Sequence, residues 1–525
     1  MITATAVARV ASGADADSLS GRIVRHVDLV THTIFDPLPD RGRSFYRFAN
    51  RLHVRTRPGT LRAALVVREG ERWSEAARQE SERNLRALTF IVPDSVEASP
   101  VGEDSVDVRV VTHDNWTTSP EFSVESGGGR NFGSVLFNER NFMGRGTSVG
   151  LGYREDITGT SRLVNVDDGQ ILGSHWHGRA AYGDGTAGTA TDGLIELPFW
   201  AEATPRSAGV SWEREQQDVP LFSDDVQAAT VREQRETGEM WLGLGHRDDA
   251  GVIRRLLLDG EVRNRREDAP ALESGAPPTF AASPEDVRIR RLSLIGQLMR
   301  PHWIVKRGIE QLDRDEDFDV GRSLELKGGY SPRAFGSTLD ESYARAILGL
   351  GADAGALGFG LVRAKVESRF VPEVREGYAE VDARWMQQPR RGMTAVLAAW
   401  GGAGRDMPAD FQLTLGGVTG LRAFPVHDLT GTEAWRGNAE LRWLFVNDWL
   451  RLVSLGAATF WDSGRTWGTG AESDAWHHDV GFGLRVSLPH SSLDMVARFD
   501  VAWAVAPEDE MHRGPGYSFG SGQAF

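Results

Sequence analysis

The sequence contains no cysteine. This absence excludes disulfide frameworks, zinc sites built on cysteine and catalysis by a thiol. The chain also has no run of about 18 consecutive apolar residues, which excludes helices that cross a membrane. Lysine is rare, because only Lys306, Lys327 and Lys365 occur among 59 lysines and arginines. The formal net charge of −15 argues against a nucleic-acid-binding protein.

Glycine and tryptophan are abundant by comparison, with 60 and 16 residues in a chain of 525. Both residue types suit a β-barrel in a membrane, glycine at tight bends and tryptophan at the membrane interfaces. The mean hydropathy of −0.34 does not exclude such a barrel, because its strands alternate lipid-facing and lumen-facing residues. A membrane-spanning barrel therefore remains a candidate fold.

Residues 1–20 are interpreted as the remnant of a leader or a flexible N-terminus. The segment has no basic start, and its apolar stretch is short and interrupted. Ala14, Asp15 and Ala16 nevertheless form the small-x-small pattern of a signal-peptidase site. A leader truncated by an incorrect start codon would explain this combination.

A mixed pattern after residue 20 predicts a small α+β domain. Gly21–Phe35 places apolar residues on one face at a spacing of two, which indicates a strand. Ser44–His53 and Ser74–Leu88 predict helices, the second with an acidic residue near its start. Ser95–Val101 and Ser105–Thr112 predict two strands joined by a short turn that contains glycine. The expected order is β-α-α-β-β.

Residues 116–525 lose helical periodicity and carry short candidate strands separated by turn-rich or charged loops. Val149, Leu151 and Tyr153 alternate with small or polar residues, which gives one apolar face and one polar face. No fixed repeat is present, which argues against a solenoid or a propeller. We predict a closed antiparallel transmembrane β-barrel of about sixteen strands, because only a closed sheet leaves no unpaired strand edge in lipid.

Four places in the chain resemble the BamA/TamA family of outer-membrane assembly factors, which is related to two-partner secretion translocators. The first is the small domain at residues 21–115, which resembles a POTRA domain and ends in Thr112–Trp116. The second is Glu139–Gly146, which resembles the turn between the first two barrel strands of that family. Gly144 and Gly146 supply the positive φ that such a turn needs.

The third and strongest resemblance is the segment Gly416–Phe424, which resembles the family's glycine-rich loop motif that folds back into the barrel lumen. In that family an arginine of this loop pairs with acidic side chains on the inner barrel wall. The matching residues are Arg422 in the loop and Glu440 and Asp462 on the wall. Arginine suits this contact because its guanidinium can bind a carboxylate through two parallel hydrogen bonds. The sequence departs from the motif at Ala423, where the family usually has glycine. The resemblance implies that the loop is shaped by Gly416, Gly417, Gly420, Leu421 and Phe424.

The fourth resemblance lies at the end of the sequence. Tyr517, Phe519 and Phe525 share one face of the expected last strand, and Gly522 lies between them. A strand that ends on an aromatic residue resembles the β-signal that assembly machinery reads in the last strand of a barrel. Phe525 would then set the register of that strand.

Three patterns that imitate enzyme or metal sites are rejected. Gly516–Gly520 matches the G-x-S-x-G motif of hydrolases, but no acid and no histidine follow Ser518. Gly349–Ala354 imitates a dinucleotide-binding loop, but no helical segment follows it. His175 and His177 share a strand face, but no third metal ligand is indicated. We therefore expect no enzyme activity, no metal site and no cofactor.

The resemblance implies an outer-membrane protein that inserts or exports client proteins through its barrel without bond chemistry, with its small domain in the periplasm. A weakly paired seam between the first and last strands would let client strands add to the barrel by β-augmentation. The expected partners are unfolded outer-membrane or secreted clients and outer-membrane lipid, with periplasmic proteins or lipoproteins as further partners and no nucleic acid. The alternatives are a translocator of one dedicated substrate, a passive barrel or porin, and an outer-membrane enzyme such as a lipase. The last needs a nucleophile with a base nearby, and none is visible.

Overall fold

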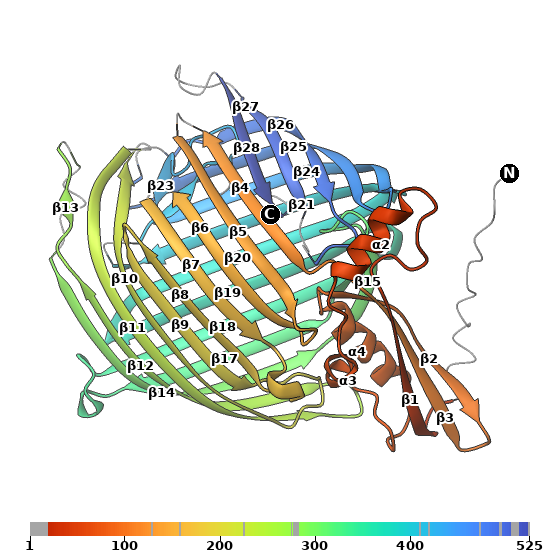
Figure 1. The fold of residues 1–525 in the computed structure, drawn as a ribbon. Helices are drawn as coiled ribbons and strands as arrows, with labels where there is room; N and C mark the ends of the chain where they lie inside the picture. Colours follow the sequence, from red (N-terminus) through yellow and green to blue (C-terminus); the bar gives the residue numbers. More distant parts are fainter. Residues whose placement is uncertain are drawn as a thin grey trace.

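The computed structural model describes residues 19–127, 130–156, 159–223, 226–274, 276, 283–408, 411–417, 420–471, 474–492, 496–505 and 514–522. It contains a small α+β unit and a large closed β-barrel, and the small unit lies against one end of the barrel (Figure 1). We call this end the small-domain mouth and the opposite end the far end. The part of the sequence with both helical and strand periodicity forms the small unit. The part with strand periodicity alone forms the barrel.

The small unit is a three-stranded sheet with two helices packed on it. The sheet order is β1-β3-β2, with β1 (Ile23–His32) parallel and β2 (Ile91–Val101) antiparallel to the central β3 (Ser105–Asp114). The packed helices are α3 (Pro58–Ala64) and α4 (Glu75–Arg86). In β3 alternate residues are buried, as the apolar spacing predicts. In β1 a bulge between Val24 and His26 shifts this alternation, so Val24 and Val27 are buried and Ile23 is exposed. The shared core contains Val24, Val27, Leu61, Leu65, Leu85, Val106, Val108 and Val110.

The helices differ from the predicted order β-α-α-β-β, because the described chain has three helices between β1 and β2. The predicted helices Ser44–His53 and Ser74–Leu88 coincide with α2 (Arg43–Leu52) and α4. However, α2 packs in a separate cluster with Phe35 and a barrel turn, so it is not part of the small unit's core. The prediction misses α3, because seven residues that begin at Pro58 are too short to show a helical period. None of the helices in the described residues is long and apolar enough to cross a membrane.

The described residues of the barrel form 20 long strands, each antiparallel to its neighbours. Their order around the wall follows the sequence, and the last strand meets the first. A two-residue strand, β13 (Ala271–Leu272), adds to β11. The long strands are β4 (Thr118–Gly127), β5 (Arg130–Phe142), β6 (Thr147–Asp156), β7 (Gly159–Asp168), β8 (His177–Gly185), β9 (Gly188–Leu197), β10 (Arg206–Ser223), β11 (Val226–Arg247), β12 (Ile253–Glu267), β14 (Glu285–Arg300), β17 (Arg322–Ser331), β18 (Glu341–Asp353), β19 (Phe359–Val371), β20 (Glu373–Arg390), β21 (Met393–Arg405), β24 (Glu433–Trp449), β25 (Val453–Trp467), β26 (His477–Ser487), β27 (Ala497–Ala504) and β28 (Pro515–Ser521).

The structure confirms an antiparallel barrel, but the predicted count of about sixteen strands is wrong. The strands that the pattern underestimates are rich in charge: β12 reads IRRLLLDGEVRNRRE and β14 reads EDVRIRRLSLIGQLMR. A hydropathy pattern assigns such segments to loops. In the structure some of these charges face the barrel interior, where Asp259, Glu261 and Arg291 are each at most 4% exposed. Others, such as Arg254 and Arg288, are exposed.

The barrel wall has an apolar outer face and a charged inner face. On β11, Met240, Leu242 and Leu244 lie on the outer face and are 64%, 63% and 64% exposed. On the inner face, the Lys327 ammonium pairs with the buried Asp259 carboxylate at 2.6 Å. An apolar exterior around a polar interior is typical of a barrel that spans a membrane.

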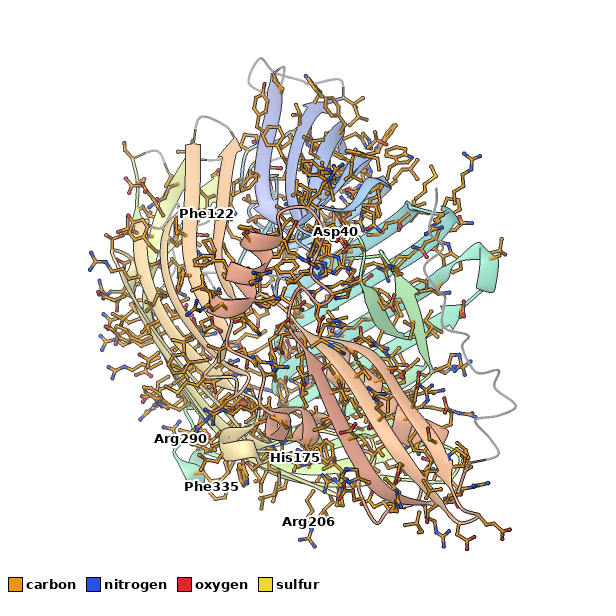
Figure 2. The ribbon with its side chains drawn as sticks, turned by 45° about the vertical axis from the view of Figure 1, so that its right-hand side comes forward. Asp40, Phe122, His175, Arg206, Arg290 and Phe335 are labelled. Carbon is orange, nitrogen blue, oxygen red and sulfur yellow. The ribbon has the colours of Figure 1, made fainter. Side chains whose placement is uncertain are left out.

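The small unit is held against the barrel at several places (Figure 2). Near the end of β5, the Asn141 side-chain amide donates a hydrogen bond of 2.9 Å to the Thr56 hydroxyl. From α4, the Arg86 guanidinium donates two hydrogen bonds, of 2.7 and 2.8 Å, to the Asp317 carboxylate. From α2, the Tyr46 hydroxyl donates to a backbone carbonyl in the turn after β24. Contacts of this kind fix the orientation of the small unit relative to the barrel.

A hairpin that no sequence pattern predicts connects β14 to β17, and we call it the mouth hairpin (residues 301–321). Its strands β15 (Trp303–Arg307) and β16 (Asp315–Asp319) pair with each other, and residues between them form the tip. The tip reaches a distant part of the wall. There the Thr394 hydroxyl donates to Gly308 O at 3.0 Å, and the Ser454 hydroxyl donates to the Asp313 carboxylate at 2.6 Å.

The tip of the mouth hairpin has a defined conformation because a buried carboxylate organises it. Glu316 accepts hydrogen bonds from the backbone N–H groups of Ile309, Glu310 and Gln311, at 2.7, 3.0 and 2.8 Å. Burial raises the pKa of the Glu316 carboxyl to about 7, although these hydrogen bonds oppose the shift. An apolar cluster joins the hairpin to the wall and contains Ile309, Phe318, Val320, Phe359, Met386 and Val396.

Candidate functional site

The segment between β21 and β24, which we call the lumen loop (residues 406–432), folds into the barrel. Its short strands β22 (Leu413–Leu415) and β23 (Leu429–Gly431) pair with each other. Leu421 is fully buried and packs in one cluster with Phe460 of β25 and Ala502 of β27. The apolar side chains of this loop therefore face the inner wall rather than water at the far end.

The predicted motif glycines take backbone conformations that suit glycine. Gly416, Gly417 and Gly420 have φ values of +127°, +57° and +126°. A Cβ atom on Gly416 would lie 1.9 Å from the carbonyl oxygen of Pro425. The N–H of Gly417 donates to the carbonyl of Phe424 at 2.9 Å, which closes the turn that carries Arg422.

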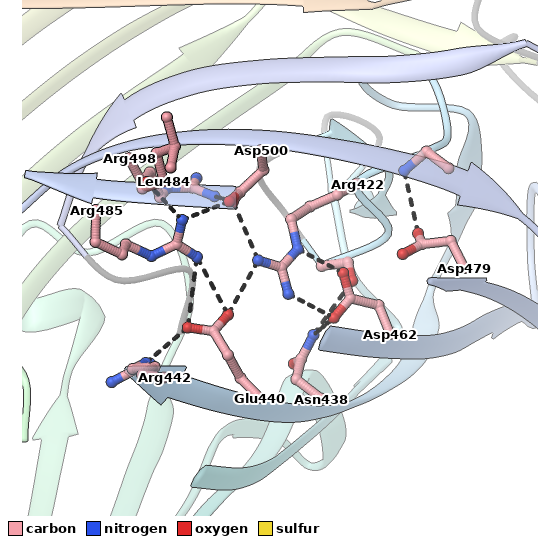
Figure 3. A network of polar contacts seen from close by, with 12 residues as sticks. Arg422, Asn438, Glu440, Arg442, Asp462, Asp479, Leu484, Arg485, Arg498 and Asp500 are labelled. Carbon is pink, nitrogen blue, oxygen red and sulfur yellow. Dashed lines mark hydrogen bonds and ion pairs between the residues drawn. The ribbon is translucent and has the colours of Figure 1, made fainter. Parts of the chain in front are cut away.

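The structure brings Arg422 together with both predicted partners (Figure 3). Its guanidinium donates two hydrogen bonds to the Asp462 carboxylate, of 2.7 Å from Nε and 2.9 Å from Nη2. Nη1 donates to Glu440 and to Asp500, each at 3.1 Å. Glu440 lies on β24, Asp462 on β25 and Asp500 on β27, so one side chain of the loop joins three wall strands. The Phe460 ring lies under the guanidinium.

The network around Arg422 is larger than the sequence reasoning predicted. Asp500 and Arg485 were not expected, and neither were Arg442, Arg498 and Asp479. The Arg442 Nε donates to Glu440 at 2.6 Å, and Arg485 forms ion pairs with Glu440 and Asp500. Four arginines thus face four acidic side chains in a buried space, which limits the cost of removing each charge from water. Arg498 and Asp500 flank Phe499, which faces outward. The alternation of side chains along a strand therefore predicts that both face the lumen.

The network also reaches the mouth hairpin. Nη1 of Arg442 donates to the backbone carbonyl of Ile309 at 2.9 Å, while Nε of the same side chain binds Glu440. Arg422 binds the other oxygen of Glu440. A continuous series of polar contacts therefore runs from the mouth hairpin to the lumen loop.

The departure from the family motif at Ala423 leaves the loop conformation intact. Ala423 does not have a positive φ, so its Cβ introduces no backbone strain. Its N–H donates to the Asp479 carboxylate at 3.1 Å. A Cβ built on Gly516 of β28 would lie 2.9 Å from the Ala423 Cα, so the lumen loop passes directly against the last barrel strand.

The predicted first barrel turn lies at the small-domain mouth, but it joins β5 to β6, which are the second and third barrel strands. Its assignment between the first two strands is wrong, because β4 precedes them in the barrel. Gly144 and Gly146 have φ values of +74° and +73°. A Cβ on Gly144 would lie 2.3 Å from the carbonyl oxygen of Arg55, and a Cβ on Gly146 would lie 2.8 Å from the Phe90 ring. Glycine is needed here for the turn and also for the close approach of the small unit.

The C-terminal strand closes the barrel through a short seam, as far as the described residues show. Tyr517, Ser518 and Phe519 pair with three residues of β4, whereas β4 and β5 pair along ten. Tyr517 is exposed on the outer face and Ser518 is buried, so Tyr517 and Phe519 share the outer face. Gly522 follows with a φ of +86°, and Phe525 lies outside the described residues.

Toward the small-domain mouth, the segment between β3 and β4 is hydrogen-bonded to the turn between β26 and β27. The N–H of Trp116 donates to the carbonyl of His490 at 2.7 Å, and the N–H of Ser492 donates to the carbonyl of Trp116 at 2.7 Å. His490 and Ser492 belong to the turn between β26 and β27. The small unit is thereby connected directly to the wall beside the seam.

The rejected histidine pair does not gather metal ligands. His177 lies between Asp167 and Glu196, at 3.2 and 3.1 Å, while the His175 ring stacks on Trp200. In the described part of the chain, no group of three or more histidine, aspartate or glutamate side chains is placed to hold a metal ion.

No protein-family model matches the chain, and no curated protein matches it. Similar solved structures include BamA from Haemophilus ducreyi lacking POTRA domains 1-3, with a TM-score of 0.39 and 14% identity over 95% of this chain and 84% of that chain. CdiB from Acinetobacter baumannii and CdiB from Escherichia coli both give TM-scores of 0.46, with 10% and 13% identity. Each covers 96% of this chain, and the match spans 74% and 76% of those chains. These TM-scores are below 0.5, so the function proposed below depends on the contacts within this chain.

Proposed function

We propose that the chain is an outer-membrane factor that inserts or exports client proteins through its barrel, without bond chemistry. The observation that carries this proposal is the seam, where the described residues of β28 and β4 form three pairs. A strand with so few partners leaves backbone N–H and C=O groups available, and an incoming client strand can pair with them. The expected partners are unfolded outer-membrane or secreted proteins.

The two faces of the wall support a membrane location. Apolar side chains such as Leu242 and Leu244 cover the outside, and ion pairs such as Lys327–Asp259 line the inside. In this proposal residues 116–525 span the outer membrane, and residues 21–115 lie in the periplasm.

The position of the lumen loop supports a role for Arg422 in controlling the seam. Arg422 binds Asp500 on β27, and the neighbouring Ala423 lies against Gly516 on β28. Glu440 and Asp462 anchor the same guanidinium to β24 and β25. Displacement of the loop would therefore remove support from the last strands, which are the strands that must separate from β4. Tyr517 and Phe519 would give the last strand its register against lipid.

Two alternative functions, a dedicated translocator and a passive porin, both require an open lumen. The lumen loop and the mouth hairpin each place buried side chains inside the barrel. This arrangement favours insertion at the seam over passage through the centre. A client-dependent ionic current through the purified protein would favour the translocator instead.

The first test is whether the protein forms a folded barrel in the outer membrane. We expect it in the outer-membrane fraction, with faster gel migration before boiling than after boiling in detergent. Recovery in the soluble fraction with no change in mobility would contradict the membrane assignment.

The second test asks whether the seam must open, and the absence of cysteine makes it simple. Tyr517→Cys combined with Ser126→Cys places two thiols on directly paired residues of β28 and β4. The matched control, Trp461→Cys with Val480→Cys, links β25 to β26 within the wall. In phospholipid vesicles, we expect the oxidised seam variant to lose insertion of an unfolded barrel client and to regain it with reductant. Continued insertion with the seam locked would exclude this mechanism.

A further inference from the structure

Helix α2 presents three distinct faces, and its buried residues lie on one of them in the part of the chain that the structure describes. Tyr46 and Ala49 are buried against the barrel turns. At 100° per residue, Phe45, Phe48 and Leu52 fall within a sector of about 60° beside that face. These three side chains are 56%, 59% and 57% exposed. The remaining sector carries three exposed arginines, Arg43, Arg47 and Arg51.

The exposed apolar face is held in a fixed orientation relative to the barrel. The Tyr46 hydroxyl donates to the carbonyl of Leu450 in the turn between β24 and β25. The Arg451 guanidinium in the same turn donates to the carbonyl of Pro37 at 2.8 Å. The Asn50 amide donates to the carbonyl of Phe35 at 3.0 Å, which ties the helix to the segment before it. α2 therefore cannot rotate to bury its phenylalanines without breaking these contacts.

Exposed apolar side chains also lie on the part of the barrel rim that α2 contacts. At the end of β24, Phe445 and Trp449 are exposed, and Leu450 is exposed in the turn that α2 contacts. Aromatic side chains at the ends of barrel strands are typical of the level at which a membrane meets water. In Figure 1, α2 lies at the small-domain mouth beside the ends of the strands near the C-terminus.

We propose that α2 lies in the plane of the membrane, in the leaflet that faces the small unit. Phe45, Phe48 and Leu52 enter the boundary between headgroups and acyl chains. The arginines on the neighbouring face bind lipid phosphates, because a guanidinium matches a phosphate in charge and geometry. The partner is thus phospholipid, and this inference rests on the membrane location proposed above. It gives the small unit a lipid contact beside the seam that is independent of any client.

The proposal can be tested with single-cysteine variants, because the natural chain has no other thiol. We would attach a spin label at Phe48→Cys in protein reconstituted into vesicles of phosphatidylethanolamine and phosphatidylglycerol. Collision rates with oxygen, which enters lipid, and with a water-soluble nickel complex report the depth of the label. Leu242→Cys on the outer wall is the lipid control, and Glu103→Cys in the β2–β3 turn is the water control.

We expect the label at position 48 to collide with oxygen several-fold more than with nickel, as at position 242, while Arg47→Cys lies closer to the water control. Each variant must keep the heat-dependent gel shift of a folded barrel. If the label at position 48 collides mainly with nickel while the label at position 242 collides mainly with oxygen, the proposal for α2 is overturned and the membrane location stands. Protection of position 48 from both reagents would show that protein covers α2, which also overturns it. Water-like collisions at position 242 would instead overturn the membrane location.

Discussion

At the scale of single residues, Arg422 neutralises carboxylates that three wall strands supply. Glu440, Asp462 and Asp500 are each at most 3% exposed. A carboxylate buried to this extent is far more costly without a cationic partner than with one. The guanidinium also supplies directional hydrogen bonds, which a bulky apolar residue could not replace.

Replacing Arg422 by alanine should lower the free energy of unfolding by about 3–5 kcal/mol, because it leaves the buried Asp462 carboxylate without its cationic partner. Arg422→Lys keeps the charge but loses the two parallel hydrogen bonds to Asp462. This variant should therefore lower the free energy of unfolding by less than Arg422→Ala does. The measurement is the denaturant concentration at which the heat-modifiable form disappears. Arg179→Ala is the control, since its pair with Asp192 is half-exposed and should contribute about 0.2–1 kcal/mol. Equal losses in the Arg422→Ala and Arg179→Ala variants would contradict the assigned role.

The centre of this site could be predicted from the sequence, but its full extent could not. The loop motif marked Arg422, and resemblance marked Glu440 and Asp462. Asp500 and Arg485 carry no local motif, and their place in the lumen depends on the register of β26 and β27. A register shift of one residue would place both side chains in lipid, and only the pairing of whole strands fixes it.

At the scale of elements, the turn between β5 and β6 determines how the small unit joins the barrel. Gly144→Ala would place a Cβ 2.3 Å from the Arg55 carbonyl oxygen. Gly70→Ala is a matched control, because Gly70 has a φ of +84° but open space around its Cβ position. In this control the free energy of unfolding should fall by about 1–2 kcal/mol, because alanine adopts the left-handed backbone conformation less readily than glycine does.

Gly144→Ala should lower the free energy of unfolding by more than the control does. It should also raise the rate of hydrogen exchange in residues 55–60, because the turn can no longer pack against that segment. Gly70→Ala should leave exchange there unchanged. The same exchange pattern in both variants would show that the turn does not hold the small unit.

The elements that the sequence missed are short or charged. The mouth hairpin consists of two five-residue strands with several charges, so no apolar alternation marks it. α3 has seven residues. The charge-rich strands β12 and β14, which a hydropathy pattern underestimates, both precede the lumen loop in the chain.

At the scale of the whole molecule, two chain segments enter the lumen from opposite ends. The lumen loop enters from the far end and the mouth hairpin from the small-domain mouth. Arg442 contacts Ile309 of the hairpin and Glu440 of the wall, and Glu440 in turn binds Arg422 of the loop. The closed barrel could be predicted from the sequence because lipid forbids unpaired edges. Its filled interior could not be predicted, because side chains that line a lumen look like those of a solvated loop.

Removing the mouth hairpin should open a path for ions. Arg300 and Arg322 are directly paired, so residues 301–321 can be replaced by Asn-Gly as a two-residue turn. In planar bilayers we expect a several-fold higher conductance than for the intact chain, with the gel shift of a folded barrel retained. A control that replaces the exposed Phe335 at the far end with serine should not change the conductance. Unchanged current without the hairpin would show that the hairpin does not block the lumen.

The lumen loop connects β21 to β24, and the mouth hairpin connects β14 to β17, so each segment is covalently part of the wall that it fills. After displacement, either segment returns in a unimolecular step, since it cannot be diluted away from its site. The time constant of this return depends on chain flexibility and not on protein concentration. Each barrel therefore recloses equally fast at any copy number, and recordings from one molecule are sufficient to measure that rate.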